Sequence, residues 1–553
     1  MRAAARYPAR RIAWFAVDRA SRLSARLAPA PLLDTLLRPS DLRTDADLLR
    51  RWGSRPGLAS LGPRWEPARH GDPRTGVFRI LGTERRDPSF ADPGVDPLWD
   101  ERLAGLHSTW ALAGTCQGPR VRAWLTEWLP VVQAATRPGT RALHPYPTAT
   151  RILHGARTLA LLHAAGHGEG PAADALTRLI WRDGAWLRWR VEHHNAANHL
   201  LREQIALLVW ARVFGRADLA SRRRADLRAT LAAQFGPCGG HVEQAAPYHA
   251  RCVRDLLDLA GLLDAAQEPL PRELLAAAVD FLGWLAVEDG VVLLGDGDGI
   301  CDPPPQALFA AAEALGIPRT HRDTLHSPTF GLAGRRSGAS TLLLRAGAVP
   351  AVTCAHVHAD QGAIAWVRAG QRLVDGRGTA TYWGPGRDAT RANANASTVA
   401  VPGRSTARFA GPFRLADHGR GELLAGPALS MRSADCDGRP LFERTAAVTD
   451  DTLTITDVAP GAGVARFHLP NAELVSVGAH EVVAARPGGR LLLTSDGPIR
   501  AARSTWYPRI GVGRPAMTVT VRLVARSAEN GAGPARSQAR TTIRFVHGPG
   551  PLE

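Results

Sequence analysis

The spacing of apolar residues changes once along this chain of 553 residues, near Thr329. Before that point apolar residues recur at helical spacing, and the breaks between segments are short and contain Gly or Pro. After it, short apolar runs with β-branched residues alternate with turns, which is typical of strands. The change predicts an α+β protein of more than one domain. A series of antiparallel helices, arranged as a bundle, a solenoid or an (α/α) toroid, precedes an antiparallel β-sandwich.

The individual elements are predicted from the same spacing. The helical pattern covers residues 147–165, 172–191, 198–214, 217–235, 248–263 and 271–287. The strand pattern covers residues 341–345, 363–367, 453–458, 490–494, 517–525 and 541–546. We expect residues 1–97 to be a basic segment, partly helical and partly irregular, that leads into the helical domain.

The basic residues of the chain are all arginines, and the formal net charge is +17. The absence of lysine excludes Schiff-base chemistry, pyridoxal phosphate attachment and a phosphate-binding loop with its lysine. A field of guanidinium groups attracts polyanions. The arginines are spread along the chain and do not cluster with aromatic residues, so no specific nucleic-acid partner is predicted.

No export signal and no membrane span is recognisable in the sequence. The apolar run at residues 12–17 is too short for a signal peptide or a membrane span. The six cysteines are scattered without a C-x-x-C pair, which excludes zinc-ribbon and thioredoxin motifs. We expect a soluble protein; its compartment and oligomeric state stay open.

A polar cluster opens the predicted helix at residues 198–214, in "VEHHNAANHLLREQ". Positions i, i+3, i+4 and i+7 share one helical face. This face would carry Asn195, Asn198, His199 and Arg202. The alternative is an ordinary polar first turn with Asn195 as N-cap.

A second motif, "CGGHVEQAAPYHARCVRD", places Glu243 before a helix that begins at Pro247 and Tyr248. A tyrosine at a helix start lies near the positive end of the helix dipole, which favours its phenolate. The alternative is a proline at the first helical position followed by a packed aromatic ring.

The third motif is "AHVHADQGAIAWVRAGQRLVDGRGTATYW". On a strand, His356, His358 and Asp360 would face one side, and His-x-His is a frequent metal-ligand pattern. Asp375 follows after an expected hairpin turn at residues 369–372. A fourth stretch, "GDGDGICD" at residues 295–302, lacks the glutamate of an EF-hand and is expected to be a solvated turn.

Taken in this order, the segments resemble the heparinase II/III family of polysaccharide lyases. "PLWDERLAGLHSTWAL", which contains Leu98 and Trp99, and "HPYPTATRI" resemble early helical segments of the family. The resemblance covers most of the chain. It implies an (α/α) toroid over residues 98–325 and a β-sandwich over residues 326–553.

The resemblance also implies a reaction, β-elimination of an acidic, uronate-containing polysaccharide. Asn198 or His199 would neutralise the uronate carboxylate, and Tyr248 and His356 would act as acid and base. His358 and Asp375 would hold a divalent metal, with zinc the expected ion. The expected substrate contacts are Asn195, Arg202, Glu243, His249 and Arg391.

The chain departs from the family pattern at several of these places. Ala396 and Ser397 stand where the family has a His-Asn pair, so the third metal ligand is open: either Asn393 or Asn395 substitutes, or the metal is lost. Cys238 and Gln244 replace an Asp and an Arg that are frequent in the family. These departures support an alternative, in which a protein of this fold binds or helps to process an acidic exopolysaccharide without cleaving it.

Overall fold

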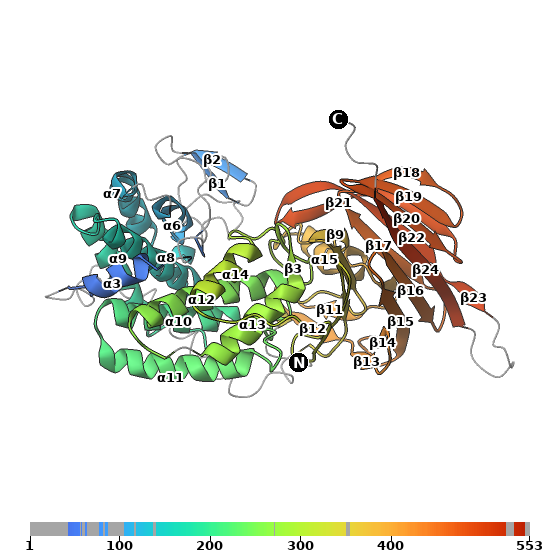
Figure 1. Cartoon of the computed structure of the whole chain (residues 1–553), viewed down its shortest axis with the longest axis horizontal. Coiled ribbons are helices and arrows are strands. Elements are labelled where there is room, and N and C mark those ends of the chain that lie inside the picture. Colours follow the sequence, from blue (N-terminus) through green and yellow to red (C-terminus); the bar gives the residue numbers. More distant parts are fainter. Residues whose placement is uncertain are drawn as a thin grey trace.

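The computed structural model describes residues 42–55, 57, 61–62, 77–80, 83–86, 104–114, 118–136, 140–269, 271–349, 354–526 and 536–547. The basic start of the chain and the segment with Leu98 and Trp99 lie outside the described residues. The helices form one side of the molecule and the large sheets the other (Figure 1).

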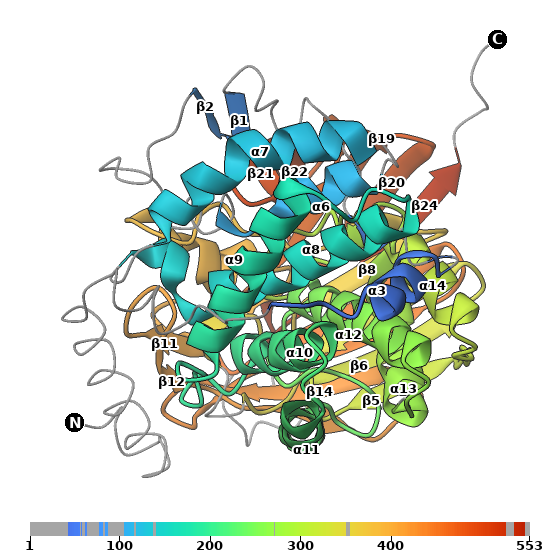
Figure 2. The same ribbon diagram turned by 90° about the vertical axis from the view of Figure 1, so that its left-hand side faces the viewer.

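Each of the six predicted helical segments coincides with a helix. Turning the molecule brings these helices towards the viewer (Figure 2). In chain order they are α3 (Ala46–Gly53), α6 (His107–Ala113), α7 (Gly118–Ala135), the 3₁₀ turn η4 (Arg141–Leu143), α8 (Pro145–Ala164), α9 (Pro171–Leu187), α10 (Asn198–Val213), α11 (Ala217–Gln234), α12 (Ala246–Ala265), α13 (Arg272–Leu285) and α14 (Pro305–Ala314). Two short hairpins interrupt the helical part: β1 (Val77–Ile80) with β2 (Thr83–Arg86), and β3 (Ala286–Val287) with β4 (Gly290–Val291).

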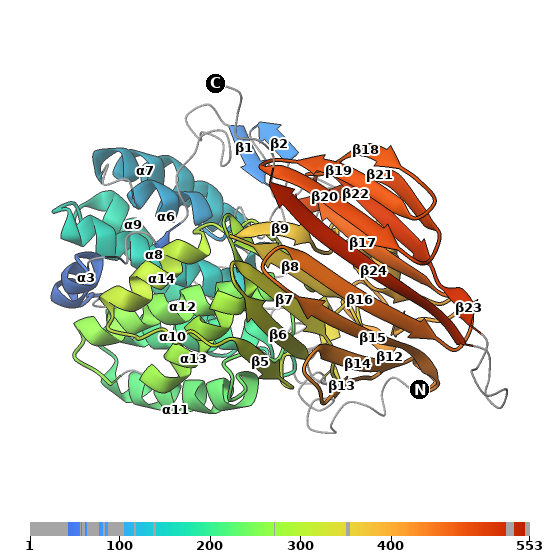
Figure 3. The same ribbon diagram turned by 45° about the vertical axis from the view of Figure 1, so that its right-hand side comes forward.

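The strands that follow form three main sheets (Figure 3). The first contains β5 (Thr324–Ser327), β6 (Leu332–Ser337), β7 (Ser340–Arg345), β8 (Ile364–Arg368) and β9 (Gln371–Val374). The second has the order β10 (Val399–Ala400), β17 (Val464–Pro470), β22 (Val512–Arg522), β21 (Ile499–Arg509). The third has the order β13 (Gly421–Leu424), β14 (Leu429–Ala434), β15 (Pro440–Val448), β16 (Thr452–Ala459), β24 (Arg536–His547), β20 (Gly489–Ser495), β19 (Glu481–Arg486), β18 (Glu473–Val477), with β23 (Val524–Arg526) paired to β24.

Smaller elements separate some of these strands along the chain: the 3₁₀ turns η5 (Cys354–His356) and η6 (Asn393–Asn395), the helix α15 (Gly386–Arg391), and the hairpin of β11 (Ala407–Phe409) with β12 (Leu415–His418). The strand ladders in the described part of the chain are antiparallel throughout. The predicted fold class, helices followed by an antiparallel sandwich, is confirmed.

Strand β7 shows how the helical and β parts are joined. Alternate residues of a strand face opposite sides of its sheet. Leu343 packs into the helical core, while Leu342 and Leu344 pack into the core between the sheets. All three side chains are fully buried, which explains why β7 is a continuous apolar run.

The change from helix to strand falls between Ala314 and Thr324, next to the boundary expected at residues 325 and 326. That each part is an independent domain remains a prediction. In the part of the chain that is described, no helix is long and apolar enough to cross a membrane.

Two local predictions were wrong. His356, His358 and Asp360 do not lie on a strand, because His356 ends the 3₁₀ turn η5 and β8 begins only at Ile364. Asn195 is neither on a helical face nor an N-cap, because α10 begins at Asn198 and Ala197 is its N-cap residue.

Candidate active site

The candidate residues meet where the start of α10, the start of α12 and the loops around η5 come together. The Asn198 Nδ2 donates to both oxygens of Glu243, at 2.7 and 2.8 Å. The Glu243 Oε1, which accepts one of these bonds, also lies 3.5 Å from the His356 Nε2. All three side chains are buried. The structure therefore brings together residues from α10, from the loop before α12 and from η5.

Tyr248, in the first turn of α12, completes this group. Its ring stacks on that of His356, with centroids 3.9 Å apart. Its hydroxyl lies 3.1 Å from the hydroxyl of Tyr382. Burial raises the pKa of Tyr248 above its ordinary value, although the guanidinium of Arg251, 4.8 Å from the ring centroid, lowers it. Tyr248 therefore keeps its proton at neutral pH, contrary to the phenolate that the helix dipole suggested.

Asp296 lies at the centre of a second, fully buried group. Its carboxylate oxygens lie 3.1 Å from the His356 Nδ1 and 2.8 Å from the His358 Nε2. Both terminal nitrogens of Arg387 donate to the same carboxylate. Burial alone would raise the pKa of Asp296, but Arg387 and His358 hold it well below its usual range. Asp296 thus orients two histidines with a permanent negative charge.

The residues proposed to hold a metal do not fit one. The Asp375 carboxylate accepts hydrogen bonds from the backbone of Leu293 and Gly376, whereas His358 pairs with Asp296. The Asn395 side chain donates to a backbone carbonyl at 2.7 Å. Among the described residues, the one group of at least three His, Cys, Asp or Glu side chains close enough to share an ion lies elsewhere, at Glu192, His199 and Glu203. The Asp296 oxygen that pairs with His358 also accepts a hydrogen bond from the guanidinium of Arg387.

His199 is separated from Tyr248 by two side chains. Its ring stacks on Tyr146, with centroids 4.2 Å apart. Arg251 donates to the Tyr146 hydroxyl at 3.2 Å and lies over the ring of Tyr248. Tyr146 and Arg251 therefore link His199 to Tyr248.

The residues predicted to contact substrate lie in different surroundings. Glu243 is inside the site, and Asn195 lies in the partly exposed loop before α10. Arg202 is buried in an ion pair with Asp255, and Arg391 donates to the backbone carbonyls of residues 411 and 412. Both guanidinium groups thus contact the protein's own groups, and their contact with a substrate stays a prediction.

The prediction for His249 is corrected by its surroundings. The side chain is fully buried, contacts the rings of Phe281 and Phe330, and hydrogen-bonds the Ala278 carbonyl at 3.0 Å. It points into the helical core, so a substrate has no access to it.

Because His249 is buried in the core, we expect it to make the stability of the protein depend on pH in the acid range. Burial lowers its pKa to about 4, from an ordinary value of 6.5. Because the folded-state pKa is depressed, stability from the neutral ring is complete above about pH 6.5 and is lost as the pH falls towards 4. We expect this histidine to reduce the free energy of unfolding by about 2 kcal/mol between pH 7 and pH 5.

Urea unfolding of the parent and of His249→Gln at both pH values measures this effect. Gln stays neutral and keeps a donor for Ala278, so the variant should lose less stability on acidification. His321→Gln, at an exposed position, is the matched control and should leave the difference unchanged. Equal pH dependence in the parent and in His249→Gln would contradict the prediction.

Three members of the site were missed from the sequence: Asp296, Tyr382 and Arg387. Asp296 belongs to the stretch interpreted as a solvated turn, yet it is fully buried. Repeated Asp-Gly pairs directly after the apolar run at residues 291–294 were the available signal, because Gly permits tight turns around a buried carboxylate. Tyr382 belongs to the end of the third motif, "TATYW", to which no role was given.

The comparisons with known proteins agree with this architecture. Residues 319–545 match the family model described as heparinase II/III-like, C-terminal. A solved heparinase III covers 92% of this chain and 86% of its own at 14% identity, with a TM-score of 0.65. A heparan sulfate lyase from Pedobacter heparinus covers 97% of this chain and 88% of its own at 15% identity, with a TM-score of 0.51. No curated protein matches the chain in sequence.

At these identities the solved structures establish the fold, and the family model assigns the C-terminal part. Together they confirm the predicted resemblance to the heparinase II/III family.

Proposed function

We propose that this protein cleaves a uronate-containing acidic polysaccharide by β-elimination. The observation that carries the proposal is the contiguous group of Asn198, Glu243, His356 and Tyr248, drawn from both parts of the fold. Elimination removes the proton at C5 of the uronate and expels the oxygen at C4. It needs a base, an acid and a group that stabilises charge on the carboxylate.

The surroundings of Tyr248 and His356 favour one of them as the acid and the other as the base. Tyr248 keeps its proton, because its pKa is raised by burial, and is therefore suited to protonate the leaving oxygen. His356 is suited to act as the base. Its Nδ1 lies against Asp296, which fixes the ring, and its Nε2 faces the side where Asn198 and Glu243 lie.

Asn198 is placed to stabilise the carboxylate. Its two short contacts run from one nitrogen to one carboxylate, and an amide nitrogen carries two hydrogens. One hydrogen directed between the Glu243 oxygens accounts for both contacts and leaves the second for the uronate. Glu243 thus holds the amide in place, and charge that develops on the substrate is met by a group already oriented.

No metal takes part in this proposal, because the expected ligands do not form a site. Arg387 supplies the positive charge that balances Asp296. The side chains that orient the proposed base are therefore held by an ion pair within the protein.

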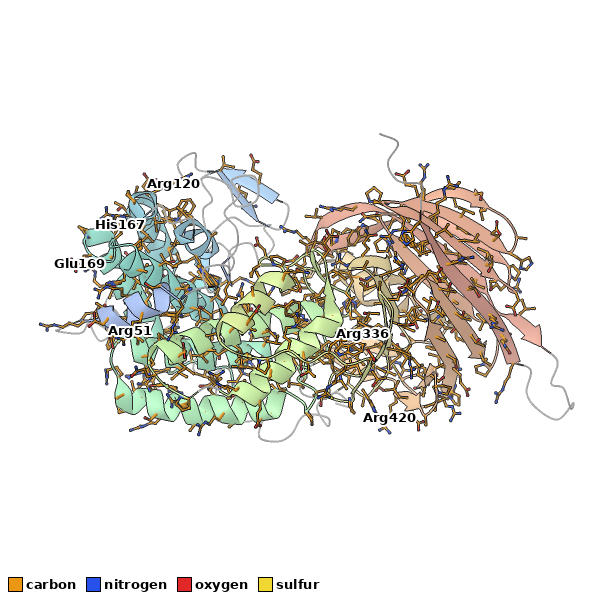
Figure 4. All side chains as sticks on the ribbon, viewed as in Figure 1. Arg51, Arg120, His167, Glu169, Arg336 and Arg420 are labelled. Atoms are coloured by element: carbon orange, nitrogen blue, oxygen red, sulfur yellow. The ribbon has the colours of Figure 1, made fainter. Side chains whose placement is uncertain are left out.

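The test is to mix the purified full chain with a panel of uronate polymers and to follow the ultraviolet absorbance of the unsaturated uronate. We expect an increase with at least one polymer and none with a neutral glucan. Binding should weaken as salt rises, because guanidinium–carboxylate attraction is screened. The arginines labelled in Figure 4 lie on both the helical and the β part, so a long anionic polymer can meet positive charge on each.

Salt-sensitive binding to a uronate polymer without any absorbance change would instead favour the non-catalytic binding protein. Equal affinity for a neutral glucan would contradict an acidic substrate altogether.

A further inference from the structure

A second group of ionisable side chains lies where the loop before α10 meets that helix. Its members are Glu192, His199 and Glu203, and one nitrogen or oxygen of each lies within 4.8 Å of the others. Both glutamates are buried and His199 is partly exposed. The proposed elimination does not use this group, so its chemistry needs a separate account.

Two neighbouring buried carboxylates need compensating positive charge. The His199 Nδ1 lies 2.9 Å from the Glu192 carboxylate, and the Nε2 atoms of His144 and His194 lie 3.5 and 3.8 Å from it. Three imidazole rings thus lie close to the Glu192 carboxylate, and the Glu203 carboxylate is next to it.

Imidazole nitrogen with carboxylate oxygen is a donor set that suits divalent first-row metals, zinc among them. Neutral imidazoles supply a lone pair to such an ion, and two carboxylates balance its charge. The loop carrying Glu192 is already tied to α10, since the Glu192 amide donates to the Glu203 Oε2 at 2.7 Å. The ligands therefore come from a fixed arrangement with little left to order.

We propose that Glu192, His199 and Glu203 form a binding site for a divalent transition metal ion, with His144 and His194 beside it. Bound metal would clamp the loop onto the first two turns of α10. Asn198 directly precedes one of the ligands, so the metal would also fix the position of that amide. The inference does not depend on the proposed lyase reaction, because it concerns ligand chemistry alone.

The experiment uses the full chain after chelation, loaded with zinc alone and then freed of excess ion. Elemental analysis should find about one equivalent of zinc per chain, because the three side chains and one water complete a single tetrahedral zinc site. His199→Gln and Glu203→Gln should each lower zinc affinity at least tenfold. Removing a residue that only supports a metal ligand already costs roughly tenfold, and removing a ligand should cost no less. Circular dichroism establishes that each variant is folded.

Asp375→Asn is the matched control, because it removes a carboxylate that the sequence analysis predicted to bind a metal. It should leave the zinc content unchanged. Cobalt provides a second measurement on the unaltered chain. Its visible bands should show nitrogen and oxygen ligands and should disappear when zinc is added. The proposal is overturned if the parent retains no zinc, if both Gln variants retain it as tightly as the parent, or if only Asp375→Asn loses it.

Discussion

Tyr248→Phe should lower turnover on a uronate polymer by about a hundredfold to ten-thousandfold, the usual contribution of a positioned acid or base. The substitution removes one hydroxyl and keeps the ring that stacks on His356, so the start of α12 should stay packed. Affinity for the uncut polymer should hardly change, because the lost interaction acts mainly in the transition state. Initial rates from the unsaturated-uronate absorbance, with equilibrium binding measured separately, provide the test.

Tyr382→Phe is the matched comparison. It removes the hydroxyl that contacts Tyr248 at 3.1 Å but leaves the proposed acid in place. We expect a smaller loss than for Tyr248→Phe. Asn198→Ala should also lower turnover, because charge on the uronate carboxylate would be less stabilised. A Tyr248→Phe variant as active as the parent would remove this residue from the mechanism.

Arg387→Met should be among the most destabilising single changes in the protein. The Asp296 carboxylate is fully buried and pairs with Arg387 through both oxygens. Breaking a buried pair from one side typically costs about 3–5 kcal/mol, because the remaining charge is left uncompensated. The same change frees the carboxylate that orients His356 and His358, so turnover of the folded fraction should fall as well. Urea unfolding and initial rates measure the two effects.

The pair of Arg444 and Asp457 is the matched control for this experiment. It is also buried and doubly hydrogen-bonded, at 2.7 and 2.9 Å, but it lies in the sandwich on β15 and β16. Arg444→Met should destabilise the protein to a similar degree and leave the turnover of folded molecules unchanged. If Arg387→Met lowers stability without affecting turnover, the ion pair is structural and does not position the base.

The sequence alone determined the order and type of those elements whose apolar residues are regularly spaced. Helical and strand periodicities are local properties, since they record which neighbouring residues must share a buried face. For this reason helix α8 and strand β16 appear within a few residues of their predicted bounds. The segments that carry Asn198, Tyr248 and His356 were found in the same way, from short motifs read in order.

Only the tertiary structure decided which side chains meet. Asp296 and Arg387 are 91 residues apart, and nothing in the local pattern of either segment indicates that they pair. His249 follows Tyr248 directly, yet one ring points into the helical core and the other stacks on His356. Two adjacent residues of a helix project about 100° apart, so packing against the rest of the fold sends one to the core and the other to the site. Packing also decided the contacts of the expected metal ligand Asp375. Its carboxylate accepts a hydrogen bond from the backbone of a loop more than 80 residues earlier in the chain.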